Sequence, residues 1–302
     1  MTKPPSMFDK DALKRLVYWI TEREKVRIAK EGGKPTPWTK DPIIANYRFC
    51  NVRRNDDKVT RWIHDNWLRP FAGDQHLWFA MVVARLVNWP DTLKWLDDAL
   101  FANGDLGKRR VLRWDAKEFV TAMHSRRAQG HKVFSGAYIV STNGRTMDKA
   151  EYLARHVLTP LWAERDGTFA HIKTDTLAIF HERLMRFDGM GSFMAAQVVA
   201  DIKYDKKGPL YNAEDWLRWA APGPGSKRGL NRVMGADHDR NFTDKEWKFH
   251  FDDLYERVIH ALPAGMLDSA QDLQNCLCEF DKFERVRLGQ GKPRSGYVAV
   301  QQ

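Results

Sequence analysis

The sequence predicts a mostly α-helical protein. Apolar residues recur at helical spacing along most of the 302 residues, and side chains that can cap a helix precede many of these stretches. Only residues 133–141 cluster β-forming side chains, which indicates a short strand pair or an extended segment. The chain is 43% hydrophobic and 29% charged, a balance typical of folded domains rather than disordered chains. No linker or repeat marks a boundary, so we expect one domain over residues 1–302.

Each predicted helix follows from a cap and an apolar stripe. Ser6 and Asp9 can cap the first helix, and Gly32 and Gly33 end it. Five further helices start at or near an acidic or amide residue, at 56–68, 75–88, 91–101, 115–128 and 148–163. Two later stripes, in residues 177–187 and 193–202, flank a turn and predict a helical hairpin over about 176–203.

The turn of this hairpin contains Gly189, Met190 and Gly191 in a G-x-G-x-x-x-A pattern. The two glycines permit a tight turn and expose backbone N–H groups at the start of a helix, where the helix dipole also favours a phosphate. We interpret this turn as a helix-hairpin-helix that holds one DNA strand by its backbone. A plain helical hairpin, in which the glycines only relieve crowding, explains the same residues.

Composition limits the partners and the compartment. The excess of 49 Lys and Arg over 39 Asp and Glu gives a net charge of +10 and favours a polyanionic partner, although charge for solubility explains it nearly as well. Three cysteines at positions 50, 276 and 278 fit neither a disulfide framework nor a zinc site, and predict a reducing compartment. With no signal-like N-terminus and no uncharged run of roughly 20 residues, we expect a cytoplasmic protein without a membrane partner. No G-x-x-x-x-G-K-[ST] motif supports ATP-dependent phosphoryl transfer.

Two segments combine cations with features that suit phosphate binding. The turn at residues 222–230 contains Ser226, Lys227 and Arg228 and precedes Arg232. Arg53 and Arg54 stand beside an acidic pair, and guanidinium groups suit bidentate phosphate contacts, while carboxylates hold a metal or take a proton. A solvated basic loop and surface ion pairs explain these two segments equally simply.

The C-terminal segment combines an acidic helix with a basic tail. Glu279 and Lys282 are three residues apart, beside the predicted buried stripe, and can simply pair on a helix. The glycine-rich tail from residue 289 carries Lys292 and Arg294 and can become ordered on a phosphate backbone.

Five segments in order resemble the alpha-glutamyl/putrescinyl thymine pyrophosphorylase family, also called amino acid:DNA transferases, which is close to the helical domain of phage 5-hydroxymethyluracil DNA kinases. They are FCNVRRNDDKVTRW, FSGAYIV with the later DKAEYL, GMGSFMAAQVVADI, WAAPGPGSKRGLNRV and LCEFDKFERVRLGQGKPR. The resemblance implies the helix-hairpin-helix fold of DNA glycosylases. It also implies hypermodification of thymine in phage DNA inside the infected bacterial cell.

In the implied reaction, an amino acid or polyamine displaces pyrophosphate from 5-pyrophosphoryloxymethyl-uracil in double-stranded DNA. Cations must lie at the leaving group and carboxylates near the electron-deficient carbon. We assign pyrophosphate binding to Arg53, Arg54, Ser226, Lys227 and Arg228. The candidates for orienting and deprotonating the amine are Asp56, Asp57, Asp201 and Glu279. The candidates for DNA binding are Gly189, Met190, Gly191, Arg232, Lys292 and Arg294. No cofactor is required, no metal ligands are assigned, and a divalent cation on the 56–57 pair is permitted.

One departure from DNA glycosylases bears on the alternatives. Glycosylases carry a catalytic Asp downstream of the hairpin, where this chain reads GPGSKRGLNRV without a carboxylate. Base excision is therefore disfavoured, although Asp201 on the second hairpin helix could supply a carboxylate. The alternatives that remain are a base-excision enzyme or a kinase-associated helical domain among enzymes, and a non-catalytic DNA-binding module from another class. The sequence does not name the amine donor.

Overall fold

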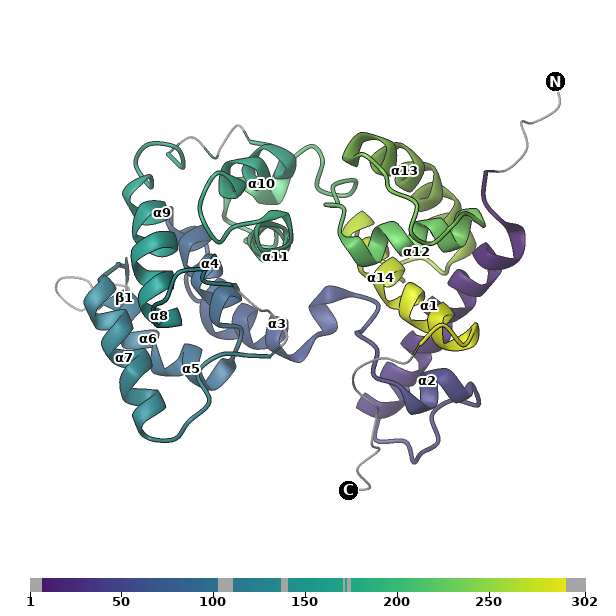
Figure 1. Ribbon diagram of the computed structural model, residues 1–302, viewed down its shortest axis with the longest axis horizontal. Coiled ribbons are helices and arrows are strands. Elements are labelled where there is room, and N and C mark those ends of the chain that lie inside the picture. The colour runs from purple at the N-terminus through teal and green to yellow at the C-terminus, as the bar shows by residue number, and fades with distance from the viewer. Residues whose placement is uncertain (1–6, 103–110, 137–140, 171, 173–174, 292–302) are drawn as a thin grey trace. The chain divides into compact units, whose positions relative to one another are not determined.

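The computed structural model describes residues 7–102, 111–136, 141–170, 172 and 175–291. The protein is mostly helical, which confirms the predicted class (Figure 1). Within the described residues, the β-structure is one antiparallel pair, β1 (Phe101–Ala102) and β2 (Val111–Leu112). The strand pair expected at 133–141 is not found in its described part, since residues 133–136 and 141 form no strand; residues 137–140 lie outside that part.

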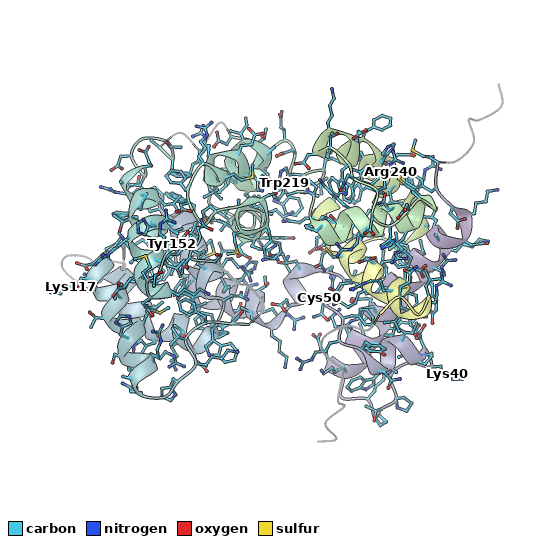
Figure 2. The ribbon with its side chains drawn as sticks, in the orientation of Figure 1. Lys40, Cys50, Lys117, Tyr152, Trp219 and Arg240 are labelled. Atoms are coloured by element: carbon cyan, nitrogen blue, oxygen red, sulfur yellow. The ribbon has the colours of Figure 1, made fainter. Side chains whose placement is uncertain are left out.

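The helices divide into two compact units, each of which is described by itself. The discontinuous unit comprises residues 1–57 and 220–302, and the inserted unit comprises residues 58–219, ending at Trp219 (Figure 2). We expected one domain because the chain passes both boundaries without a glycine- or serine-rich linker. That the whole chain acts as one functional domain stays a prediction.

In its described residues, the discontinuous unit contains five α-helices around an apolar core. They are α1 (Lys10–Glu31), α2 (Pro42–Asn46), α12 (Pro224–Met234), α13 (Asp244–Ala261) and α14 (Ala270–Arg287), with a short 3-10 helix at Arg54–Asp56. Asp9 caps α1 by accepting a hydrogen bond from the Ala12 amide, as predicted. The core lies between α1, α12, α13 and α14, with fully buried Trp19, Trp247 and Phe280.

Close approach of α12 and α14 explains the glycines of the basic turn. A Cβ added to Gly225 would lie 2.4 Å from Sγ of Cys278, and one added to Gly229 would lie even closer to the main chain of α14. Since real Cβ atoms do not approach this closely, both positions require glycine for the packing of the two helices. Sequence analysis interpreted these glycines as part of an anion-binding turn, whereas the structure uses them inside a helix.

The inserted unit consists of short helices around one buried helix. It contains α3 (Lys58–Ile63), α4 (Leu77–Val87), α5 (Pro90–Trp95), α6 (Asp97–Leu100), α7 (Ala116–Ala128), α8 (Lys149–Tyr152), α9 (Thr159–Ala163), α10 (Leu177–Met185) and α11 (Ser192–Ile202). One turn of π-helix follows α3 at His64–Leu68, and another joins α8 to α9 at Leu153–Leu158. Every residue of α4 is buried, and α11 packs against it.

The predicted helical hairpin is present. α10 and α11 pack against each other and are joined by residues 186–191. Gly189 has a φ of +73°, and a Cβ added there would lie 2.8 Å from Cγ2 of Val157. Both the left-handed backbone and the close neighbour therefore require glycine at this position. The wider glycosylase-like arrangement stays a prediction.

Candidate functional site

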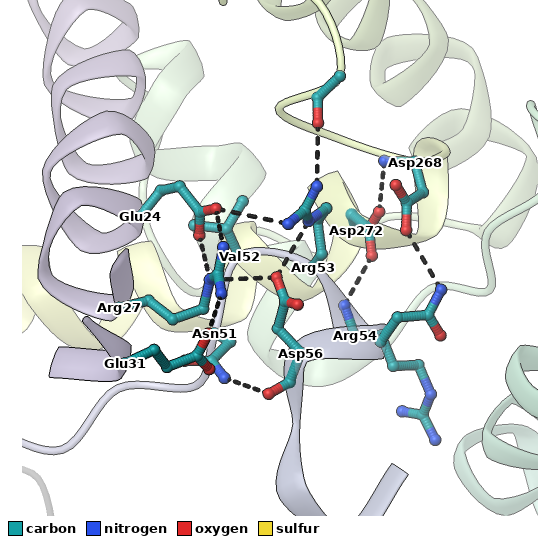
Figure 3. A network of polar contacts seen from close by, with 12 residues as sticks. Glu24, Arg27, Glu31, Asn51, Val52, Arg53, Arg54, Asp56, Asp268 and Asp272 are labelled. Carbon is teal, nitrogen blue, oxygen red and sulfur yellow. Dashed lines mark hydrogen bonds and ion pairs between the residues drawn. The ribbon is translucent and has the colours of Figure 1, made fainter. Parts of the chain in front are cut away.

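Arg53 belongs to a network of carboxylates and guanidinium groups in the discontinuous unit (Figure 3). Its Nε donates to Oδ2 of Asp56 over 3.0 Å, and Arg27 contacts the same oxygen over 3.2 Å. Glu24 lies 2.6 Å from Arg27 and 3.6 Å from Arg53. Although burial opposes it, the bond to Asp56 and the nearby carboxylates raise the pKa of Arg53 overall. Arg53 is therefore a fixed cation, held at the surface of the unit.

This network changes what Asp56 can do. Asp56 is buried, accepts a hydrogen bond from Arg53 and forms an ion pair with Arg27, so a divalent cation there would face two positive charges at short range. Its carboxylate is better placed to orient Arg53 than to hold a metal ion. Asp57 is exposed and ends the first segment of the unit. The roles predicted for this acidic pair stay predictions.

The short 3-10 helix at residues 54–56 is attached to the start of α14. The backbone amide of Arg54 donates to Oδ1 of Asp272 over 3.0 Å, and Asn55 donates to Asp268 over 3.2 Å. Asp272 also caps α14 through a capping box with Ser269. Figure 3 shows these contacts beside the Arg53 network. The Arg53–Arg54 segment is therefore fixed relative to α14.

Glu279 connects the same segment to the middle of α14. Its carboxylate accepts from Nζ of Lys282 over 2.7 Å, as the three-residue spacing predicted, and from the backbone amide of Cys50 over 3.0 Å. Glu279 is 6% exposed. The structure thus brings together two sequence blocks that lie 229 residues apart. Glu279 lies two residues before Asp281 on α14, the carboxylate that contacts two arginines of α12.

The basic turn at residues 222–230 forms the start of α12. Ser226 is fully buried, and its hydroxyl pairs with the backbone of Gly223, which caps the helix. A pyrophosphate could reach this hydroxyl only if the cap opened. Lys227 lies at the surface, where Nζ contacts Asp244 over 2.9 Å. Asp244 is 74% exposed, so this ion pair is weak and can exchange for a phosphate.

Arg228 and Arg232 extend from α12 to a carboxylate on α14. Nε of Arg228 donates to Asp281 over 2.9 Å, and Nε of Arg232 donates to the other oxygen of Asp281 over 3.2 Å. Asp272 contacts the Arg53–Arg54 segment, and Asp281 contacts the cations of α12. These two carboxylates are nine residues apart on α14, which places their positions about 14 Å apart along the helix axis. α14 is the common support of both basic segments.

The hairpin turn of the inserted unit is held by its own polar network. Asp188 accepts from Oη of Tyr152 over 3.1 Å and pairs with Arg145 over 3.0 Å. Although its partial burial acts in the opposite direction, these contacts lower the pKa of Asp188. Met190 is fully buried and its amide donates to the Phe187 carbonyl, so this residue fixes the turn and does not offer its amide to DNA. Gly191, by contrast, is exposed at the start of α11.

Asp201 is placed differently from the sequence prediction. It is completely buried in the inserted unit and accepts two hydrogen bonds from Arg85, at 2.5 and 2.6 Å. Arg85 also donates to Thr60, and His64 lies 3.4 Å from Asp201. A carboxylate so enclosed cannot meet an incoming amine unless the unit opens. The structure therefore assigns Asp201 to the core of the unit.

Two predicted DNA ligands, Lys292 and Arg294, lie outside the described residues. Sequence analysis missed Asp281 and Glu284, the buried carboxylates that hold arginines from other helices. The sequence did contain a signal for them, because they are three residues apart and flank the apolar stripe of the predicted helix. In the described part of the chain, no helix is long and apolar enough to span a membrane.

Comparisons with known proteins identify one family. The family described as 5-hmdU DNA kinase, helical domain, matches residues 10–292. The 5-hmdU DNA kinase of Bacillus phage SP10 is 26% identical over 218 residues. That match covers 67% of this chain but 33% of the phage protein. No solved structure matches the chain significantly.

Proposed function

Because the chain belongs to the family of the 5-hmdU DNA kinase helical domain, we propose that it takes part in thymine modification of phage DNA as a transferase. In this proposal, an amino acid or polyamine displaces pyrophosphate from 5-pyrophosphoryloxymethyl-uracil. The amine nitrogen forms a bond to the methylene carbon, the carbon–oxygen bond breaks, and its electron pair leaves with the pyrophosphate. The amine loses one proton. The reaction takes place in the infected host cell.

The observation that carries the proposal is the set of arginines held by carboxylates along α14 and beside it. Arg53 is fixed by Asp56, and Arg228 is fixed by Asp281, which is only 1% exposed. Cations that are already oriented stabilise a developing negative charge without reorganising during the reaction. Pyrophosphate departure creates such a charge. Arg53, Arg54, Lys227 and Arg228 are the proposed pyrophosphate ligands.

The proton of the amine requires an acceptor in the same unit. Glu279 and Asp57 are the remaining candidates, since Asp56 is engaged by two guanidinium groups and Asp201 lies in the core of the inserted unit. Glu279 already accepts from Lys282 and from a backbone amide, an arrangement that fixes its orientation. We therefore assign Glu279 to the orientation and deprotonation of the amine.

The relative's kinase activity is not carried over to this chain. The matched segment is a third of the phage kinase, and this sequence contains no G-x-x-x-x-G-K-[ST] motif. Base excision also loses support, because Asp201, the carboxylate that could have served it, is completely buried. A DNA-binding module without catalytic activity is the second candidate, favoured by the hairpin turn that exposes Gly191 at the start of α11.

The test is incubation with DNA that carries pyrophosphorylated 5-hydroxymethyluracil, together with glycine, serine, glutamate or putrescine. The DNA is then digested and its nucleosides are weighed by mass spectrometry. A nucleoside with the mass of the amine adduct supports the transferase. DNA binding without a new nucleoside would favour a DNA-binding module without catalytic activity. Abasic sites would indicate a glycosylase.

Two variants test the site within the same assay. Arg53→Ala leaves Arg27 on Asp56, and Lys227→Ala removes the ion pair with Asp244 and a hydrogen bond to the Phe242 carbonyl. Each should lower turnover at saturating DNA much more than it lowers DNA affinity, because the leaving-group contact strengthens in the transition state. Lys25→Ala, which removes an exposed cation paired with Glu22, is the matched control. Equal losses of turnover and affinity would mean that Arg53 and Lys227 contact only the DNA backbone and not the pyrophosphate.

A further inference from the structure

The last turns of α14 carry two buried carboxylates surrounded by arginines from three helices. Asp281 and Glu284 are three residues apart, and their side chains are 1% and 2% exposed. The Asp281 contacts come from Nε of Arg228 over 2.9 Å, of Arg232 over 3.2 Å and of Arg285 over 3.5 Å. The Glu284 contacts come from Nε of Arg15 over 3.2 Å and of Arg287 over 2.7 Å. We call these seven residues the α14 arginine cluster.

The cluster has more positive charge than its carboxylates require. Five guanidinium groups face two carboxylates, which leaves three positive charges uncompensated within the cluster. One cation for each buried carboxylate would satisfy the need for charge compensation. The surplus places like charges side by side, and their repulsion opposes folding. A bound anion would compensate these charges and relieve the repulsion.

The arginine heads are both oriented and accessible. Four of them have side chains between 32% and 37% exposed, those of Arg15, Arg228, Arg285 and Arg287. Arg228 donates to Asp281 through Nε, and Arg285 pairs with it over 3.5 Å, whereas Arg15 and Arg287 each donate to Glu284 through both Nε and Nη2. The Nη groups of Arg228 and Arg285, and Nη1 of Arg15 and Arg287, are therefore the donors proposed to face a ligand. A guanidinium fixed in this way loses little further entropy when it binds a phosphate.

Arg232 supplies an independent observation. Its side chain is only 7% exposed, and its Nη2 is buried without a hydrogen-bond acceptor among the described residues. Its Nη1 donates to the side-chain oxygen of Gln290 over 2.6 Å. A buried donor without an acceptor is unfavourable. Because Gln290 is exposed, a ligand oxygen can replace its side-chain oxygen as the acceptor for Nη1 of Arg232.

We propose that the α14 arginine cluster binds the phosphate backbone of duplex DNA. The proposal deepens the function above, because it assumes DNA as the substrate and adds Arg15, Arg285 and Arg287 as backbone ligands. Phosphate oxygens match the planar donors of a guanidinium, and such contacts position a protein on DNA without reading its sequence. Arg228 belongs to both sets. The other arginines of the cluster would hold the strand while the pyrophosphate ligands, Arg228 among them, act on one modified base.

The test is the double variant Arg285→Gln with Arg287→Gln. It preserves the fold's charge compensation, because Asp281 retains Arg228 and Arg232 and Glu284 retains Arg15. For unmodified duplex DNA, the slope of log affinity against log salt should fall by about 1.8, since each phosphate contact contributes about 0.9. Affinity should fall roughly tenfold at ~0.1 M salt. The double lysine variant keeps the charge and should retain most of the slope.

Arg257→Gln is the matched control, because Arg257 is 39% exposed and pairs with Asp253 on α13. It should change neither the slope nor the affinity. If the glutamine variant folds and binds DNA like the wild type, the cluster is not a DNA site. A second readout needs no variant: DNA should protect Arg285 and Arg287, but not Arg257, from phenylglyoxal modification of the wild-type protein. Absence of this protection would overturn the proposal.

These outcomes separate the cluster from the transferase activity. All binding measurements use unmodified DNA and no amine, so they do not depend on product formation. Weakened binding in the variant without product in the wild type would reject the transferase alone. Product formation with unchanged binding in the variant would reject the cluster alone.

Discussion

Gly229 on α12 lies directly against the main chain of Leu277 on α14. A Cβ added to Gly229 would lie 2.1 Å from the carbonyl oxygen of Leu277. The helix that carries Lys227 and Arg228 is therefore positioned by backbone contact with the helix that carries Glu279 and Asp281. Packing and charge placement are coupled at this interface, since moving α12 would move Lys227, Arg228 and Arg232.

Gly229→Ala should lower the free energy of unfolding by about 1–3 kcal/mol, the usual cost of overpacking a tight interface. The measurement is equilibrium unfolding in urea. Gly136→Ala is the control, because a Cβ there meets nothing within 4 Å. Equal stability of the two variants would contradict the close approach of α12 and α14.

Asp281→Asn should destabilise the protein by about 3–5 kcal/mol, because it leaves the buried guanidinium of Arg232 without its counter-charge. Asp253→Asn, which breaks an exposed pair with Arg257, should cost at most about 1 kcal/mol. Thermal and urea unfolding of both variants provide the comparison. A small effect of Asp281→Asn on stability would contradict the role of Asp281 in compensating the charge of the arginines around it.

Asp201→Asn should also destabilise the protein by about 3–5 kcal/mol, because Arg85 would stay buried without a charged partner. In a sample that remains folded at low temperature, turnover per folded molecule should match the wild type. Loss of turnover with unchanged stability would restore Asp201 as a catalytic residue and would falsify its assignment to the core.

Acid should weaken the contact between α7 and α8 through Asp148. Burial tends to raise the pKa of this carboxyl, but hydrogen bonds from Arg127 and His124 and from the Ala150 amide lower it overall. A carboxyl whose pKa is lower in the folded state contributes stability above its unfolded pKa of about 3.9, and loses that contribution as pH falls towards the folded pKa.

Asp148→Asn should therefore lower stability near neutral pH, with a difference from the wild type that shrinks below about pH 4. Asparagine can still cap α8, which leaves the charge as the main change. Urea unfolding between pH 3 and 7 measures this difference. Asp11→Asn, at a side chain 78% exposed, should show no such trend. A pH-independent difference at Asp148 would contradict the charge contribution.

Local signals in the sequence predicted the helices well where caps and stripes coincide. Asp9 and Asp115 cap helices as expected, and the hairpin around Gly189 is present. Patterns could not reveal the π-helical turns, because an apolar stripe continues through them with little change. We did not single out α13 from the sequence, although Thr243 and Glu246 at its start form a capping box that the sequence itself signals.

The candidate site was harder to predict because its contacts are long-range. Arg228 and Asp281 are 53 residues apart, and Arg15 and Glu284 are 269 residues apart. Neither spacing leaves a periodic trace in the sequence. The sequence marked the cations but not the carboxylates that orient them. We named Asp201 as a catalytic candidate from the sequence, although its apolar neighbours Val198, Ala200 and Ile202 are the pattern of a buried position.

The most direct measurement is the stoichiometry of one reaction with labelled amine and pyrophosphorylated DNA. The proposed transferase releases one pyrophosphate for every amine that becomes attached to DNA, and Arg53→Ala slows both to the same extent. Release of pyrophosphate without attachment of amine, or absence of both reactions while the protein binds the DNA, would contradict the proposed activity.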